Sequence, residues 1–326
     1  MHIVIKKTIL VSIVATELLT LGFIIRQIYY TKWSNVLGVQ NAIILKRENL
    51  IYPADDSLRY FYEPKPSIQE LAREEWLPYT ATYTINSDGL NERFDYQVPK
   101  PSETYRILVL GDSETFGIYV NTNDNYSERL EDKLNSQLVC NKFKNFEVIN
   151  LGVPGYDLQY AAHRFKIRGN KYDPDLIIWR ILSNDFQDNN ELIAAKVNSY
   201  LINKINGEND LNSMEAKEKV ALQLKAAQEV WNEYGEKYIA EFQYKQLLEF
   251  LQNYQNPVLI FTPRNTSDNY KQLIDLASQS RPNISYVESS DNYDKLPDTH
   301  PSVIGHNQIA DELFTYLTSQ RIISCD

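Results

Sequence analysis

The sequence predicts an α/β fold in which a mainly parallel sheet is covered by helices on both faces. Five short apolar runs rich in strand-forming residues alternate with segments of helical spacing, a pattern typical of parallel sheets. With 326 residues and 43% hydrophobic content, the chain is long enough to bury a full-sized core. The expected strands cover 106–110, 147–151, 176–182, 257–262 and 284–287, and the expected helices cover 126–138, 158–168, 270–278 and 303–317.

The first 30 residues are predicted to be a membrane anchor. The apolar stretch TILVSIVATELLTLGFII, residues 8–25, follows Lys6 and Lys7 and is just long enough to span a bilayer. Glu17 interrupts it, and a carboxylate within a spanning helix is costly. A cleaved signal peptide and an ordinary buried helix are the two alternatives.

Residues 31–103 are predicted to form an extension that packs on the main domain. This region is rich in Tyr and Pro and contains a Ser87-Asp88-Gly89 turn between short β-like stretches. A disordered linker is the alternative, although many tyrosines argue against it. The prolines of VPKPSE, residues 98–103, mark the boundary, so the main domain is expected over 104–326. Within it, about 190–254 is a charged helical insertion, either a lid or a solvated amphipathic face.

Composition and the lack of known binding motifs argue against several kinds of partner and cofactor. The net charge of −10 and the absence of a basic block argue against nucleic acid as a partner. Cys140 and Cys325 are too few for a disulfide framework, although they could pair in an oxidising compartment. No HExxH, CxxC, calcium-loop, GxGxxG or phosphate-loop motif occurs, so neither a metal nor another cofactor is expected.

A polar motif follows each of four expected strands, at the carboxyl ends where reactive groups of open α/β sheets gather. The fourth motif also precedes the last expected helix. The motifs are GDS with Ser113, INLGVPG with Gly152, ILSND with Asn184, and DTHPSVIGH with Asp298 and His300. GDS alone reads equally well as a turn. Four ordered motifs on separate strand ends are a much stronger signal of a site.

With these motifs, the sequence resembles the SGNH hydrolase superfamily, the GDSL-type esterases and lipases. The similarity runs from about residue 105 to 317, and NSDGLNERFDYQVPK before it resembles the lead-in of membrane-anchored bacterial members. The resemblance implies a three-layer α/β/α flavodoxin-like sandwich. It also implies a catalytic domain on the extracytoplasmic side, held by the membrane segment, or secreted if that segment is cleaved.

The resemblance assigns a role to each motif residue. Ser113 is the nucleophile, His300 the base that takes its proton, and Asp298 the acid that orients the imidazole. The oxyanion donors are the N–H groups of Ser113 and Gly152 and the side-chain amide of Asn184. Taken alone, Asn184 would read as a helix cap.

Three departures from the family pattern stand out. Glu114 follows the nucleophile, where a carboxylate facing the oxyanion would oppose catalysis, so it is expected to turn away. Leu182 replaces a glycine of the third motif, and Asp298 lies two residues before His300 rather than three, which leaves Asp294 in reserve. Among the remaining candidates, His163 is expected on the surface, His306 to pack or cap, Gly155 to occupy a turn and Asp185 to be structural.

The residues predict a serine esterase that works through an acyl-enzyme on Ser113. The resemblance implies O-acyl esters as its substrates, such as acetyl esters on cell-surface carbohydrate. One alternative is an SGNH-type O-acyltransferase that acts on a surface glycan and relies on a membrane partner to supply the acyl group. The other is a catalytically silent glycan-binding protein of the same fold, for which Glu114 is the best motive.

Overall fold

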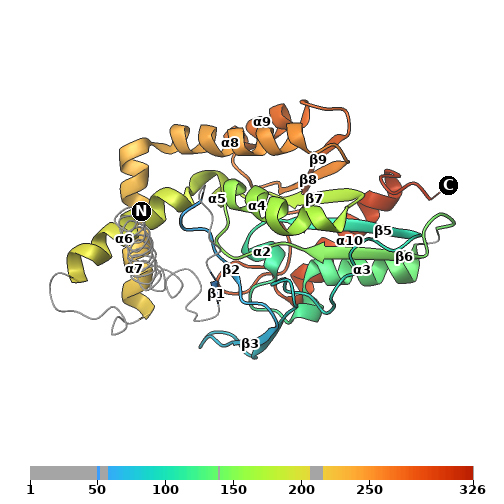
Figure 1. Ribbon diagram of the computed structural model, residues 1–326, viewed down its shortest axis with the longest axis horizontal. Coiled ribbons are helices and arrows are strands. Elements are labelled where there is room, and N and C mark those ends of the chain that lie inside the picture. Colours follow the sequence, from blue (N-terminus) through green and yellow to red (C-terminus); the bar gives the residue numbers. More distant parts are fainter. Residues whose placement is uncertain (1–49, 52–57, 139, 206–215, 326) are drawn as a thin grey trace, which may run out of the picture.

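A computed structural model describes residues 50–51, 58–138, 140–205 and 216–325 of the chain (Figure 1). The predicted membrane segment at 8–25 lies outside these residues. Among the residues described, no helix combines the length and the apolar character needed to cross a bilayer.

The centre of the fold is a five-stranded parallel sheet (Figure 1). Its order is β6-β5-β7-β8-β9, which is 2-1-3-4-5 along the chain, the flavodoxin-like order. All five expected strands are present, and β5, β7 and β8 are buried along their whole length. Their bounds are β5 Thr104–Leu110, β6 Asn145–Asn150, β7 Leu176–Arg180, β8 Val258–Pro263 and β9 Ile284–Ser289.

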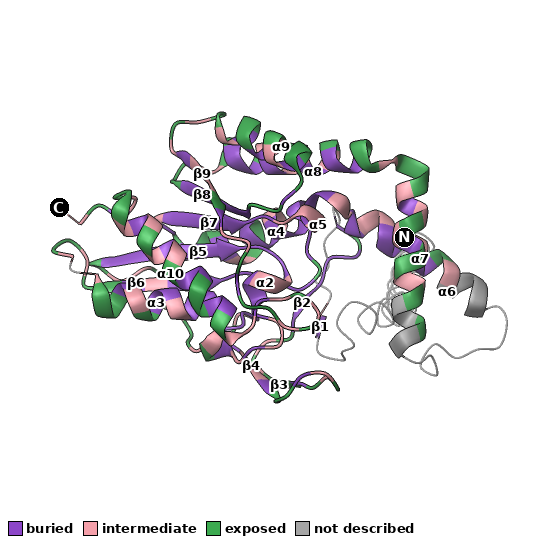
Figure 2. Cartoon of the chain, turned by 180° about the vertical axis from the view of Figure 1, so that it is seen from behind, coloured by how far each residue is buried: buried purple, intermediate pink, exposed green. Residues whose placement is uncertain are grey.

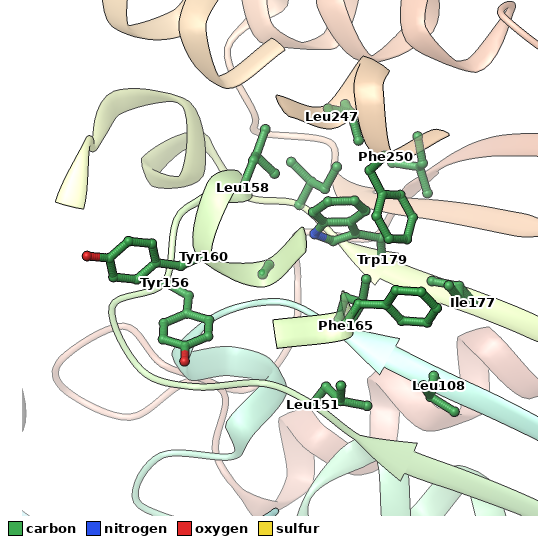
Figure 3. Packing of buried hydrophobic residues seen from close by; sticks show 14 of the residues in the cluster. Leu108, Leu151, Tyr156, Leu158, Tyr160, Phe165, Ile177, Trp179, Leu247 and Phe250 are labelled. Atoms are coloured by element: carbon green, nitrogen blue, oxygen red, sulfur yellow. The ribbon is translucent and has the colours of Figure 1, made fainter. Parts of the chain in front are cut away.

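Helices cover both faces of this sheet. On one face, α3 (Tyr126–Gln137) and α10 (Val303–Ser319) contribute Leu130, Leu134 and Leu313 to a shared apolar core. On the other face lie α4 (Leu158–Arg164), α8 (Glu236–Asn253) and α9 (Asp268–Ser278). There the Trp179 ring of β7 packs edge-on against Phe250 of α8 at 4.9 Å between centroids (Figure 3). Figure 2 shows the resulting layers, with buried strands between helices that are exposed only on their outer sides.

The described residues of the charged segment 190–254 contain the helices α6, α7 and α8. α6 (Asn190–Ile205) and α7 (Ala216–Tyr234) pack on each other through a small core of their own that includes Val197, Ala226 and Val230. They project to one side of the sandwich in both views (Figures 1 and 2). α8 returns the chain to the sheet before β8, so it acts as the crossover between two parallel strands.

The described part of the extension contains two short antiparallel pairs. β1 (Leu50–Ile51) pairs with β2 (Glu63–Pro64), and β3 (Ile68–Ala72) pairs with β4 (Ala81–Ile85). The second pair, here called the β3–β4 hairpin, buries Tyr83 against Phe116 with ring centroids 5.1 Å apart. Since Phe116 lies three residues after Ser113, the hairpin reaches the segment that carries the expected nucleophile.

A disulfide joins Cys140 to Cys325, with 4.8 Å between their Cα atoms. The pairing that the sequence left open is therefore formed. It links the loop before β6 to the chain beyond α10, near the amino ends of the strands.

Candidate active site

Ser113 stands at the carboxyl end of β5, in the first turn of the short helix α2 (Ser113–Phe116). Asp112 caps this helix, because its Oδ1 accepts a hydrogen bond of 3.0 Å from the Glu114 N–H. Gly111 permits the sharp strand-to-helix turn. A Cβ there would collide with Thr115 Oγ1 and come within 3.0 Å of the Arg180 carbonyl oxygen.

Ser113, His300 and Asp298 form a continuous hydrogen-bonded chain. His300 Nε2 lies 2.9 Å from Ser113 Oγ, and His300 Nδ1 lies 2.8 Å from Asp298 Oδ2. The side chains of His300 and Asp298 are 26% and 25% exposed, so the imidazole can be reached from solvent. Asp294 plays no part in this chain, since its carboxylate accepts from the Ser302 hydroxyl instead.

Thr299 explains how an acid only two residues from the histidine can contact its ring. This residue has φ +79°, a left-handed conformation that β-branched side chains rarely adopt. The conformation is held by hydrogen bonds from Thr299 N–H to Leu296 O at 2.9 Å and from Leu296 N–H to His300 O at 2.8 Å. The tight loop turns the Asp298 carboxylate toward Nδ1 of His300.

Asn184 lies in α5 (Ser183–Gln187), at the carboxyl end of β7. Its amide Nδ2 donates to Asp112 Oδ2 at 2.9 Å, which brings it next to the turn that carries Ser113. It does not cap α5. Asp185 serves the end of that helix by accepting the Leu182 N–H at 2.8 Å, as its expected structural role requires.

Gly152 departs from the expectation. Its N–H donates to Asn150 Oδ1 at 2.9 Å, so the group expected to bind the oxyanion is already engaged. A Cβ at this position would lie 2.7 Å from Thr115 C, which shows that the glycine permits close packing between the end of β6 and α2. The oxyanion role expected for Gly152 stays a prediction, since in this structure its N–H is bonded to Asn150. Gly155 has φ +79° and occupies a turn closed by Tyr156 N–H and Val153 O at 3.2 Å, as expected.

Glu114 is paired with Arg180, which the sequence did not single out. Arg180 Nε and Nη2 lie 2.8 and 2.7 Å from Glu114 Oε2, and Arg180 is only 1% exposed. The lone cation in the apolar run LIIWRIL was the signal that could have revealed this partner.

The role of Asp112 as the cap of α2 was also not predicted from the sequence. Burial, and then the charge of Glu114, raise the pKa of Asp112, while the hydrogen bond from Asn184 opposes this shift.

The remaining described histidines lie outside the hydrogen-bonded chain of Ser113. His306 is fully buried in α10, where its Nδ1 accepts the Tyr126 N–H at 3.2 Å and its ring stacks on Tyr126. Burial lowers the pKa of His306 to about 3, so it is neutral at physiological pH. His163 was expected on the surface, but it is half-buried with its ring 4.7 Å from that of Phe61.

A pocket of about 250 Å³ opens beside the site. Its lining begins at neighbours of the expected catalytic residues, namely Glu114, Ser183 and Thr299. The lining is mostly polar or charged, and it further includes Arg180, Asn265, Thr266, Asp291 and Lys295.

No known family model matches the sequence, and no curated protein matches it. Solved structures with a similar fold include a two-domain esterase active on acetylated mannans, at 15% identity over 68% of this chain and 51% of that chain, with a TM-score of 0.39. The present chain thus spans about half the length of that esterase. The Clostridium thermocellum family 3 carbohydrate esterase matches at 16% identity, over 68% of this chain and 100% of that chain, with a TM-score of 0.39.

A protein of the G-D-S-L family from Desulfitobacterium hafniense matches at 15% identity, over 64% of this chain and 97% of that chain, with a TM-score of 0.34. Identities this low do not transfer an activity from those proteins to this chain.

Proposed function

We propose that this chain is a serine esterase of the SGNH type that hydrolyses short O-acyl esters of carbohydrates through an acyl-enzyme on Ser113. The observation that carries the proposal is the hydrogen-bonded chain from Ser113 Oγ to His300 Nε2 at 2.9 Å and from His300 Nδ1 to Asp298 at 2.8 Å. A serine hydroxyl is a weak nucleophile at neutral pH and needs such a base to attack a carbonyl.

In the proposed reaction, Ser113 Oγ attacks the ester carbonyl while its proton moves to His300 Nε2. Asp298 holds the Nδ1–H and stabilises the imidazolium, and His300 then returns the proton to the leaving alcohol oxygen. A water molecule, deprotonated by the same nitrogen, resolves the acyl-enzyme. General base catalysis of this kind typically contributes about 10²- to 10⁴-fold in rate.

The backbone N–H of Ser113 and the amide of Asn184 are the proposed donors to the oxyanion. Asn184 approaches from the end of β7 and is positioned by its hydrogen bond of 2.9 Å to Asp112. Loss of one such donor typically costs about 3 kcal/mol of transition-state stabilisation. The ion pair with Arg180 supports the view that Glu114 is turned away from the oxyanion, so Glu114 gives no ground for a silent binding protein.

The pocket beside the site supports a short acyl group. Its lining of charged and hydroxyl side chains offers little apolar surface to a long alkyl chain. Burial of an alkyl chain is favourable only against apolar surface, at about 25 cal/mol per Å². An acetyl group has little apolar surface, so it loses little of this burial free energy in a polar pocket.

The location proposed for the catalytic domain is extracytoplasmic. The Cys140–Cys325 disulfide supports it, because such bonds persist in oxidising compartments. In this proposal the apolar segment at 8–25 tethers the domain to the membrane.

The test is hydrolysis of p-nitrophenyl acetate, butyrate and octanoate by the full-length protein, with Ser113→Ala and His300→Ala as matched variants. We expect hydrolysis that falls with chain length, and a loss of at least about 10³-fold in both variants. Equal activity in Ser113→Ala would overturn the serine mechanism. A preference for octanoate would overturn the short-acyl assignment alone.

A further inference from the structure

We propose that Trp76 and Tyr119 form a binding subsite for the sugar ring of the ester's alcohol portion. This inference rests on the proposed esterase function and deepens it, because it names the part of the chain that recognises the carbohydrate. Trp76 comes from the loop that joins β3 to β4, and Tyr119 follows α2.

A row of three rings runs from the hairpin loop to the proposed general base. The Tyr119 ring lies 5.9 Å from that of His300, at an interplanar angle of 75°. The Trp76 ring lies 4.9 Å from that of Tyr119, at 79°. The hairpin loop therefore forms a wall of the site on the side of His300.

The side on which this wall lies identifies the portion of substrate it meets. His300 has to deliver a proton to the leaving oxygen, so the alcohol must sit against the imidazole during turnover. Groups that contact the imidazole from outside the Ser113–Asp298 chain are thus neighbours of the alcohol rather than of the acyl group. Trp76 and Tyr119 are both only half-buried, so part of each side chain is exposed at the surface of the site.

The backbone of Tyr119 is strained, and a hydrogen bond to the β3–β4 hairpin holds it in this conformation. Its φ is +65°, unusual for a residue with a side chain, and its N–H donates to the Tyr83 hydroxyl at 2.6 Å. Tyr83 is fully buried in β4, so the β3–β4 hairpin determines the position of Tyr119. Strain of this kind persists when the surrounding structure enforces it, and it clusters at ligand sites.

Aromatic rings beside a catalytic base suit a pyranose. The axial C–H groups of a sugar present an apolar face that packs on an aromatic ring, while its hydroxyls remain available to polar neighbours. An aromatic wall adds large contact area at little cost in conformational entropy, because the rings are already ordered. A small alkyl alcohol would not extend from His300 past Tyr119 to Trp76.

The test compares glucose pentaacetate with ethyl acetate, whose alcohol is too small to reach Trp76. We expect Trp76→Ala to lower kcat/KM for glucose pentaacetate by roughly five- to tenfold through KM, with ethyl acetate changed less than about twofold. Trp76→Phe should recover most of the loss. Leu71→Ala is the matched control, since Leu71 is a 52% exposed apolar residue on the same hairpin.

The outcomes separate this inference from the proposed function. If the wild type hydrolyses ethyl acetate but not glucose pentaacetate, or if Trp76→Ala weakens both substrates equally while its melting temperature is unchanged, the sugar subsite is wrong and the esterase stands. If the wild type hydrolyses neither ester, the proposed function itself fails.

Discussion

Glu114, which follows the proposed nucleophile, forms an ion pair with the buried side chain of Arg180. A carboxylate one residue from the nucleophile would repel the negative oxygen of the tetrahedral intermediate. Arg180 neutralises it from the end of β7, and its guanidinium is packed against the rings of Phe261 and Tyr293, 5.4 and 5.7 Å from their centroids. These contacts hold the Arg180 guanidinium in place, and the ion pair holds the Glu114 carboxylate beside it.

Replacing Arg180 tests whether this pairing protects catalysis. Arg180→Met leaves the Glu114 charge unpaired beside the reaction, and we expect kcat/KM for p-nitrophenyl acetate to fall about 10²-fold. The double variant Arg180→Met/Glu114→Gln removes both charges, so it should recover most of that activity. If the double variant remains as impaired as the single one while both melt near the wild-type temperature, the pair does not act through its charge.

The loop of Asp298, Thr299 and His300 depends on the left-handed conformation of Thr299. Thr299→Pro imposes φ near −65° where the loop has +79°, and it also removes the N–H that bonds Leu296 O. We expect a fall in ester hydrolysis of about 10²-fold or more, because the imidazole is displaced from Ser113. Thr299→Gly, which adopts positive φ freely, should keep activity within about threefold of wild type. Comparable activity in the two variants would contradict the role given to this loop.

The strands and helices could be predicted from periodicity because each element follows from its own residues. The expected strand at 106–110 and helix at 303–317, for example, correspond to β5 and α10 with small extensions at their ends. The strand-end motifs likewise placed Ser113, Asn184, Asp298 and His300 at one edge, since the carboxyl ends of parallel strands meet there.

Hydrogen-bond partners could not be predicted in the same way. Whether the Gly152 N–H is free depends on the rotamer of Asn150, and whether Glu114 points away depends on Arg180, 66 residues distant. Neither contact follows from local propensity. The left-handed Thr299 was equally hidden, because nothing in its residue type favours positive φ.

At the scale of the whole molecule, buried carboxylates join the extension to the sandwich. Glu92 of the extension accepts the Asn150 N–H of β6 and lies close to Glu128 and Glu131 of α3. Glu131 is 7% exposed and accepts the Val148 N–H at 2.8 Å. Burial raises the pKa of Glu131 to about 7, opposed by that hydrogen bond and assisted by the charge of Glu128.

This shift predicts how stability depends on pH. A carboxyl whose folded pKa is raised stabilises the fold fully below its unfolded pKa, near 4.5, and this contribution is lost as pH rises through about 7. Denaturant unfolding between pH 5 and 8 should therefore show falling stability in the wild type and a smaller fall in Glu131→Gln. Identical pH dependence in the two proteins would show that Glu131 does not titrate in this range.

The most direct test of the central claim is to trap the acyl-enzyme. Full-length protein is mixed with p-nitrophenyl acetate, quenched in acid within milliseconds, and digested for mass spectrometry. The proposed mechanism predicts an acetyl group on Ser113 in the wild type and none at that position in Ser113→Ala or His300→Ala. Turnover of the ester with acetyl on another residue, or with full activity in Ser113→Ala, would contradict the assignment of Ser113 as the nucleophile.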